Sequence, residues 1–305
     1  MRCHVYCTLE GALIAVLPDM KKKIALLILI LFVLPTSAIW MVGGILASPT
    51  YTTMGALPVD LVGQDIQISS KSGTVLKGWW LPKDGPGTIV LMHGVHSNRR
   101  SMLERARFLS IEGYSVLLFD FQAHGESRGR HITFGYLESL DAASAVDFVR
   151  QKKLSDKVGI IGVSMGGAAS LLATPPLSVQ AMVLESVYPT IEEAVTDRLT
   201  NSMGAWAGII TPLLTIQLKP RIGVGVEQLR PIDAARKVYA PKLFIFGTSD
   251  THTKLDESLR LVASSAEPKE SWAISGAGHV DLYEYAKDEY KTRILSFFNK
   301  YLRIS

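Results

Sequence analysis

The chain has very little cysteine. Its 305 residues contain two, Cys3 and Cys7, and both lie before residue 20. The rest of the chain therefore cannot build a disulfide framework, a zinc site with cysteine ligands or a cysteine nucleophile. The formal net charge is only +4, and no lysine- and arginine-rich run is interleaved with aromatic residues, which argues against a nucleic-acid partner. The length suffices for one α/β domain of roughly 250 residues with an appendage.

Charge is absent from residues 24–47, an apolar run of 24 residues. At a rise of about 1.5 Å per residue, a helix of this length crosses a hydrocarbon core of roughly 30 Å. Three lysines at 21–23 directly precede the run, and no lysine or arginine follows it until Lys71. This asymmetry predicts a single-pass membrane anchor after a cytoplasmic tail, residues 1–23, with the rest of the chain on the extracytoplasmic side.

The same apolar run is also compatible with a secretory signal that starts at Met20. Thr36 and Ala38 then occupy the small-residue positions of a cleavage site, and the domain becomes secreted or periplasmic after cleavage. The apolar run continues for nine residues past Ala38, which favours the retained anchor.

Residues 64–305 are predicted to form one α/β domain, reached through a linker at 48–63 that is rich in Pro, Gly and Thr. Continuous apolar runs alternate with helical stretches, which is typical of a mostly parallel sheet covered by helices on both faces. The predicted strands are 64–69, 75–81, 88–94, 115–121, 157–164, 180–186, 241–250 and 270–276. The predicted helices are 99–112, 136–152, 165–173, 253–264 and 281–302.

About fifty residues interrupt this alternation, between the strands that end near Ser186 and begin near Pro241. They include an apolar stretch, 203–218, that Pro212 interrupts. Two interpretations stay open. The segment is either a helical excursion packed on its own domain or a cap at about 188–238 whose apolar inner face shapes a substrate pocket. We favour the cap.

One serine stands among glycines in the stretch GVSMGG, residues 162–167. An apolar run precedes Ser164 and a helical stretch follows it, so this residue lies at a strand-to-helix junction. Glycines at 162 and 166 allow strand and helix to approach closely around a tight turn that presents the hydroxyl. The carboxyl edge of a parallel sheet is where such folds bind ligands, and the helix N-terminus adds partial positive charge. Ser164 is therefore the predicted nucleophile.

A serine nucleophile needs a base to accept its proton and a carboxylate to orient that base. His279 is the predicted base, because it follows the last strand in a loop that contains glycines. Asp250 is the predicted carboxylate at the end of the preceding strand, and Glu185, which ends the strand before that, competes for the role. The backbone N–H groups of Met165 and Val95 are predicted to form the oxyanion hole.

Five motifs together resemble the α/β-hydrolase superfamily: LMHGVHSNR, LLFDFQAHGESRG, GVSMGG, FGTSD and GAGH. They are most similar to its branch of serine aminopeptidases and monoacylglycerol-lipase-like esterases, over about residues 60–303. The resemblance implies an eight-stranded, mostly parallel sheet with Ser164, Asp250 and His279 as a catalytic triad. It also implies a structural role for the FDFQAHGESRG loop, in which this chain carries Gln122-Ala123 where relatives often carry Arg-Gly.

Together these features predict a membrane-anchored serine hydrolase. Its substrate is expected to be a small or lipid-like ester or thioester, and the mechanism requires no metal and no organic cofactor. A serine aminopeptidase or other peptidase, and an acyltransferase, remain alternatives on the same triad. A peptidase of this kind usually needs acidic groups to hold the free amine of its substrate, and Glu192, Glu193 and Asp197 of the cap are candidates.

Overall fold

The computed structural model describes residues 20–153 and 157–303 of the chain. Two units are distinguished, one that ends at Ile45 and a second that begins at Leu46. Cys3, Cys7 and most of the predicted cytoplasmic tail lie outside the described residues.

The described part of the first unit is an apolar helix. It belongs to the helical span Met20–Leu46, which has 27 residues and a mean hydropathy of 2.5 and is long and apolar enough to cross a membrane. A π-helical turn, Leu29–Val33, is followed by α2 (Leu34–Leu46). Pro35 lies just after this turn and has no N–H to donate, which accounts for the interrupted hydrogen-bond ladder. Length and composition are shared by membrane anchors and signal sequences alike.

The second unit is built on an eight-stranded sheet with the order β10-β9-β8-β7-β4-β5-β3-β2. Its strands are β2 (Gln64–Ser69), β3 (Val75–Leu81), β4 (Thr88–Met92), β5 (Ser115–Phe119), β7 (Val158–Val163), β8 (Ala181–Glu185), β9 (Lys242–Gly247) and β10 (Lys269–Ile274). Every neighbouring pair is parallel except the two that contain β3. The predicted mostly parallel, eight-stranded sheet is confirmed.

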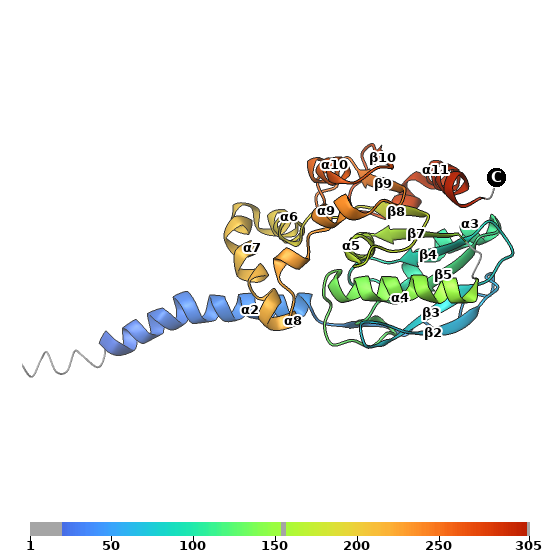
Figure 1. Ribbon diagram of the computed structural model, residues 1–305. Helices are drawn as coiled ribbons and strands as arrows, with labels where there is room; N and C mark the ends of the chain where they lie inside the picture. The colour runs from blue at the N-terminus through green and yellow to red at the C-terminus, as the bar shows by residue number, and fades with distance from the viewer. Residues whose placement is uncertain (1–19, 154–156, 304–305) are drawn as a thin grey trace, which may run out of the picture. The chain divides into compact units, whose positions relative to one another are not determined.

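Helices cover both faces of this sheet (Figure 1). One core contains α3 (Leu103–Ile111) and α11 (Leu282–Leu302), and the other contains α4 (Tyr136–Lys152), α5 (Met165–Leu172) and α10 (Leu255–Ser264). The pleat of β4 separates the two cores, because successive side chains of a strand point to opposite faces. Ile89 and Leu91 accordingly pack with α3 and α11, whereas Val90 and Met92 pack with α4 and α5.

Short helices fill the chain between β8 and β9. They are α6 (Ile191–Met203), η3 (Gly204–Trp206), α7 (Ala207–Thr215), α8 (Leu218–Ile222), η4 (Val226–Gln228), α9 (Pro231–Ala234) and η5 (Ala235–Lys237). We call α6, α7 and α8 the cap. Thr190 begins it, since its hydroxyl accepts a hydrogen bond from the backbone N–H of Glu193 and so caps α6. A small separate core that includes Ile191, Leu218 and Leu229 stabilises this segment.

Residues 48–63 belong to the second unit, pack against its core and do not form a free linker. β1 (Thr50–Tyr51) pairs in parallel with β6 (His124–Gly125). Met54 and Leu61 are buried and join the core under α3 and α11. The composition of this segment correctly predicts turns. It does not reveal that the side chains of Met54 and Leu61 anchor those turns to the core.

Truncation of Met54 tests whether this segment belongs to the folded unit. Met54→Ala is expected to lower the free energy of unfolding by about 2–4 kcal/mol, because it leaves a cavity in a closed core. Val59→Ala is the matched control, since Val59 lies in the same segment with its side chain fully exposed. Urea unfolding of the full chain in detergent micelles measures both. Equal stabilities for the two variants would contradict the packing described.

Candidate active site

Ser164 occupies a strained turn between β7 and α5. Its backbone has φ 49° and ψ −111°, a region that residues other than glycine rarely adopt. A Cβ on Gly162 would lie 2.7 Å from the Cα of Gly167, and a Cβ on Gly166 would lie 2.4 Å from the carbonyl oxygen of Met92. Only glycine therefore fits at positions 162 and 166, where the sequence predicted a close approach of strand and helix. This approach holds the start of α5 against the ends of β7 and β4.

Asp250 and His279 are joined by a hydrogen bond. The Oδ2 atom of Asp250 lies 2.8 Å from Nδ1 of His279, and its Oδ1 accepts the backbone N–H groups of His252 at 2.8 Å and Thr253 at 3.0 Å. Burial alone would raise the pKa of Asp250, but the hydrogen bond to His279 and the two amides hold that pKa below its ordinary value. Asp250 is thus an ionised carboxylate that binds Nδ1 of His279 and leaves Nε2 without a partner among the described residues.

Ser164 and His279 line one cavity of about 350 Å³. The loop after β4 contributes Val95 to its wall, and α6 contributes Arg198. The structure brings the serine and the histidine to this common wall without a hydrogen bond between them. In active sites without substrate, catalytic hydrogen bonds are often long and tighten only in the substrate complex.

The peptide between Gly94 and Val95 is oriented by His93. Nδ1 of His93 donates to the carbonyl oxygen of Gly94 at 2.7 Å, and Nε2 accepts the backbone N–H of Phe121 at 3.1 Å. Burial lowers the pKa of His93 to about 3, so the ring is neutral, with one donor and one acceptor. In a trans peptide the C=O and N–H groups point in opposite directions, so the N–H of Val95 points away from His93. A Cβ on Gly94 would lie 3.7 Å from Cβ of Ser164, which places this peptide beside that serine.

Met165 supplies the second predicted oxyanion donor. It is the first residue of α5, where a backbone N–H has no acceptor inside the helix. In the described part of the chain, neither this amide nor that of Val95 donates to a protein acceptor. Both are positioned to serve a ligand oxygen next to Ser164.

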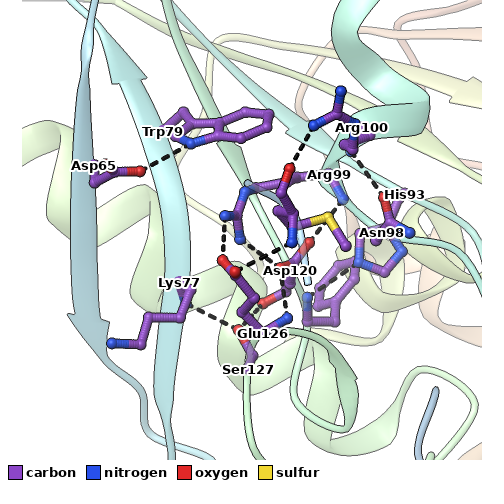
Figure 2. Close-up of polar contacts among 12 residues, drawn as sticks. Asp65, Lys77, Trp79, His93, Asn98, Arg99, Arg100, Asp120, Glu126 and Ser127 are labelled. Atoms are coloured by element: carbon purple, nitrogen blue, oxygen red, sulfur yellow. Dashed lines mark hydrogen bonds and ion pairs between the residues drawn. The ribbon is translucent and has the colours of Figure 1, made fainter. Parts of the chain in front are cut away.

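The loop after β4 is fixed to the loop after β5 (Figure 2). Asp120 accepts the backbone N–H of Arg99 at 2.7 Å and its Nη1 at 2.5 Å, and Nη2 of Arg99 pairs with Glu126. Asn98 caps the short helix η2 (Arg99–Met102) through its side chain. These contacts give the FDFQAHGESRG loop a defined structural role, which is to hold the loop that carries the Val95 amide.

Glu185, the competing candidate for the catalytic carboxylate, is engaged elsewhere. It is buried, and its Oε2 lies 2.7 Å from Nη2 of Arg105, while the Tyr290 hydroxyl donates to Oε1 at 2.5 Å. Arg105 also pairs with Asp281 at 2.8 Å, two residues after His279. Glu185 therefore helps to anchor the histidine loop and does not contact the imidazole. Sequence reasoning missed this arrangement, because its members lie far apart along the chain.

The cap contributes differently from what was expected. Its largest apolar side chains on and next to α7 point to solvent, with Trp206 65%, Ile209 60% and Ile216 74% exposed. The single cap residue in the cavity wall is Arg198. The expectation that an apolar inner face of the cap shapes this cavity is therefore wrong.

The acidic residues of the cap also lie outside the cavity. Asp197 pairs with Lys254 at 2.5 Å, and Glu193 pairs with Arg260 at 2.5 Å. None of the three candidates for holding a substrate amine, Glu192, Glu193 and Asp197, lines the cavity.

Comparison with known proteins finds a matching family model and relatives that align with most of the chain. A family model described as serine aminopeptidase, S33, matches residues 84–228. The uncharacterized protein MT2364 of Mycobacterium tuberculosis is 30% identical over 240 residues, which cover 77% of this chain and 78% of that protein. The uncharacterized protein YqkD of Bacillus subtilis is 25% identical over 237 residues, or 76% and 78% of the two chains.

Several solved structures with the same fold are named as esterases. The Pyrococcus furiosus esterase Pf2001 superposes with a TM-score of 0.71 at 23% identity, over 84% of this chain and 98% of its own. The esterase EaEST from Exiguobacterium antarcticum superposes with a TM-score of 0.57 at 16% identity, over 77% and 99% of the two chains. At these identities the likeness concerns the fold.

A methyl group on Gly166 tests the geometry of the turn. Gly166→Ala is expected to reduce activity by about 100-fold or to prevent folding, because the new Cβ forces the start of α5 away from β4 and displaces the nucleophile. Gly208→Ala is the matched control in a helix, where a Cβ meets no atom within 4 Å. Ester turnover and circular dichroism measure the effect. A fully active Gly166→Ala enzyme would refute the close approach.

Proposed function

The chain belongs to the α/β-hydrolase superfamily, in the serine aminopeptidase S33 family, and from this premise we propose that it is a serine hydrolase that cleaves an ester or thioester. Ser164 is the nucleophile in this proposal, His279 the general base and Asp250 the residue that orients the base.

One observation carries the proposal. A serine held at positive φ at the end of a central strand shares a cavity with a histidine whose other ring nitrogen lies 2.8 Å from a buried carboxylate. Structural reasons alone do not require a strained non-glycine residue at this point, whereas presentation of a nucleophile does. The glycines around Ser164 keep this conformation accessible at the edge of the sheet.

Acylation is the first step. Nε2 of His279 accepts the proton of Ser164 as the hydroxyl oxygen attacks the carbonyl carbon, and Asp250 stabilises the imidazolium that forms. The carbonyl oxygen becomes an oxyanion between the N–H groups of Val95 and Met165, each of which contributes on the order of 3 kcal/mol to the transition state. The tetrahedral intermediate collapses as His279 gives its proton to the leaving alcohol or thiol, and an acyl-enzyme remains.

Deacylation repeats these roles with water. His279 removes a proton from the water molecule, whose oxygen attacks the acyl carbon, and the same two amides stabilise the second oxyanion. Collapse releases the carboxylic acid and returns the proton to Ser164. Attack by an alcohol in place of water would give an acyltransferase on the same site.

Esters and thioesters fit this site better than amino-terminal peptides. A free substrate amine requires an acidic group in the cavity. Asp281 is the carboxylate in the wall, and it is paired with Arg105 and caps α11. Of the acidic residues of the cap, Asp197 pairs with Lys254 and Glu193 with Arg260, and Glu192 does not line the cavity. The esterases named above add support through their shared fold.

The helical span Met20–Leu46 serves as a single-pass membrane anchor in this proposal. The lysines at 21–23 lie at its start, and no lysine or arginine follows it until Lys71. The positive-inside rule then places the catalytic domain on the extracytoplasmic side. A cleaved signal sequence is the alternative, and it would release the same domain.

Removal of the Ser164 hydroxyl tests the reaction. Ser164→Ala is expected to abolish p-nitrophenyl ester turnover and labelling by a fluorophosphonate probe, because it removes the oxygen that forms the acyl-enzyme. Ser69→Ala is the matched control, since Ser69 is exposed at the end of β2. Both variants are compared in full-length protein with equal circular dichroism spectra. A folded Ser164→Ala protein that still labels would eliminate this nucleophile.

Membrane extraction tests the anchor. When the chain is expressed in bacteria, it is expected to stay in the membrane pellet after washing at alkaline pH, at the mass of the full-length chain. Replacement of residues 20–45 with a cleavable secretory signal is expected to move the domain to the soluble fraction, because the apolar helix is then lost. A shortened, soluble product from the native sequence would show that the segment is cleaved.

A further inference from the structure

One cation in the cavity wall has no anionic partner. Arg198 comes from α6, is half-buried and lines the cavity together with Ser164 and His279. Its Nη1 donates to the backbone carbonyl of Ala194 at 2.8 Å, and no ion pair joins it to a described carboxylate. A partly desolvated guanidinium is costly unless an anion compensates it.

Two carboxylates near Arg198 each have another partner, while Oδ2 of Asp197 has no hydrogen-bond partner among the described residues. Asp197 pairs with Lys254 at 2.5 Å, and Asp250 with His279 at 2.8 Å. Burial lowers the pKa of Arg198, and the opposing charges of Tyr188, Asp250 and Asp197 do not offset this effect. The guanidinium of Arg198 therefore keeps several donors that the protein does not fill.

The other two buried arginines near the site show the opposite pattern. Arg99 is held by Asp120 and Glu126, and Arg105 is held by Glu185 and Asp281. Arg105 also lines the cavity, but its two carboxylates hold its pKa well above the usual value despite burial. Both of these arginines organise the scaffold, and Arg198 does not take part in either cluster.

A second polar group of the same wall is also unsatisfied. Ser186 is buried, lines the cavity, and its hydroxyl has no hydrogen-bond partner among the described residues. It directly follows β8 with a positive φ of 46°, and its N–H donates to the carbonyl of Ile245 at 2.9 Å, so the backbone is fixed. Buried hydroxyls are normally hydrogen-bonded, so an unpartnered hydroxyl on a residue of the cavity wall is a candidate donor to a ligand atom.

We propose that Arg198 and Ser186 form an anion subsite, so that the preferred substrate is an ester or thioester that carries a carboxylate or phosphate group. The guanidinium fork matches the planar oxygens of a carboxylate and the oxygens of a phosphate, and the serine hydroxyl adds a further donor. The inference rests on the proposed function, because it concerns what the same site accepts. It also explains why a substrate with a free amine is disfavoured, since that amine would meet a cation.

Paired substrates that differ only in charge test this subsite. Mono-p-nitrophenyl glutarate and p-nitrophenyl 4-carbamoylbutyrate place the charge, or its neutral amide, on the acyl side. 4-Acetoxybenzoate and 4-acetoxybenzamide place it on the leaving-group side, and 4-acetoxyphenyl phosphate compares phosphate with carboxylate. The full-length wild-type enzyme in detergent is expected to show a kcat/KM about 10 to 100 times higher for the anionic member of at least one pair, as a charge-assisted hydrogen bond would give.

Variants assign the preference to its residues. Arg198→Gln is expected to bring the anionic-to-neutral ratio of kcat/KM close to one, Arg198→Lys to keep part of it, and Ser186→Ala to lower it a few-fold. Arg230→Gln is the matched control, since Arg230 lies between η4 and α9 and pairs with Asp233 on the surface. Labelling by the fluorophosphonate probe verifies that each variant retains a folded site.

The outcomes separate the two proposals. A wild-type enzyme that labels and hydrolyses neutral esters, with a ratio near one in every pair, overturns the anion subsite and leaves the serine hydrolase intact. A preference that persists in Arg198→Gln overturns the assignment to this residue. A wild-type enzyme that neither labels nor hydrolyses any of these esters overturns the proposed function itself.

Discussion

The close contact between the start of α5 and the ends of β7 and β4 is the constraint on which the site depends. Gly166 lies so near the carbonyl oxygen of Met92 that no side chain fits between them. This contact brings the strained Ser164 and the free amide of Met165 next to the loop after β4, which carries the Val95 amide. Ser164 and the two proposed oxyanion donors thus come from one piece of backbone packing, and no flexible side chain is needed to align them.

Buried charges hold the loops around this contact. Arg99 ties the loop that carries Val95 to the loop after β5 (Figure 2), and Arg105 ties the histidine loop to the end of β8. A buried ion pair of this kind contributes little net stability over an apolar pair, but breaking it leaves an uncompensated charge, so each pair strongly favours one loop conformation. Arg198 differs because no described carboxylate pairs with it, which is why we propose a substrate anion as its partner.

Much of the fold could be predicted, because its signals are local. The strands at 64–69 and 75–81 and the helix at 136–152 have the predicted bounds. The alternation of a strand and the periodicity of a helix can both be recognised from consecutive residues of the sequence. The order of strand ends also predicted which carboxylate would meet His279. The packing of residues 48–63, the partners of Glu185 and the position of Arg198 could not be predicted, since each depends on segments that only tertiary folding brings together.

The central claim is that Ser164 carries the acyl group during turnover. Rapid quenching of the enzyme with a p-nitrophenyl ester, followed by intact-mass and peptide mass spectrometry, tests it most directly. The account predicts a burst of p-nitrophenol no larger than one equivalent per chain, with the mass of the acyl group added to the peptide that contains Ser164. Sustained turnover without any acylated peptide, or with the acyl group on another residue, would contradict it.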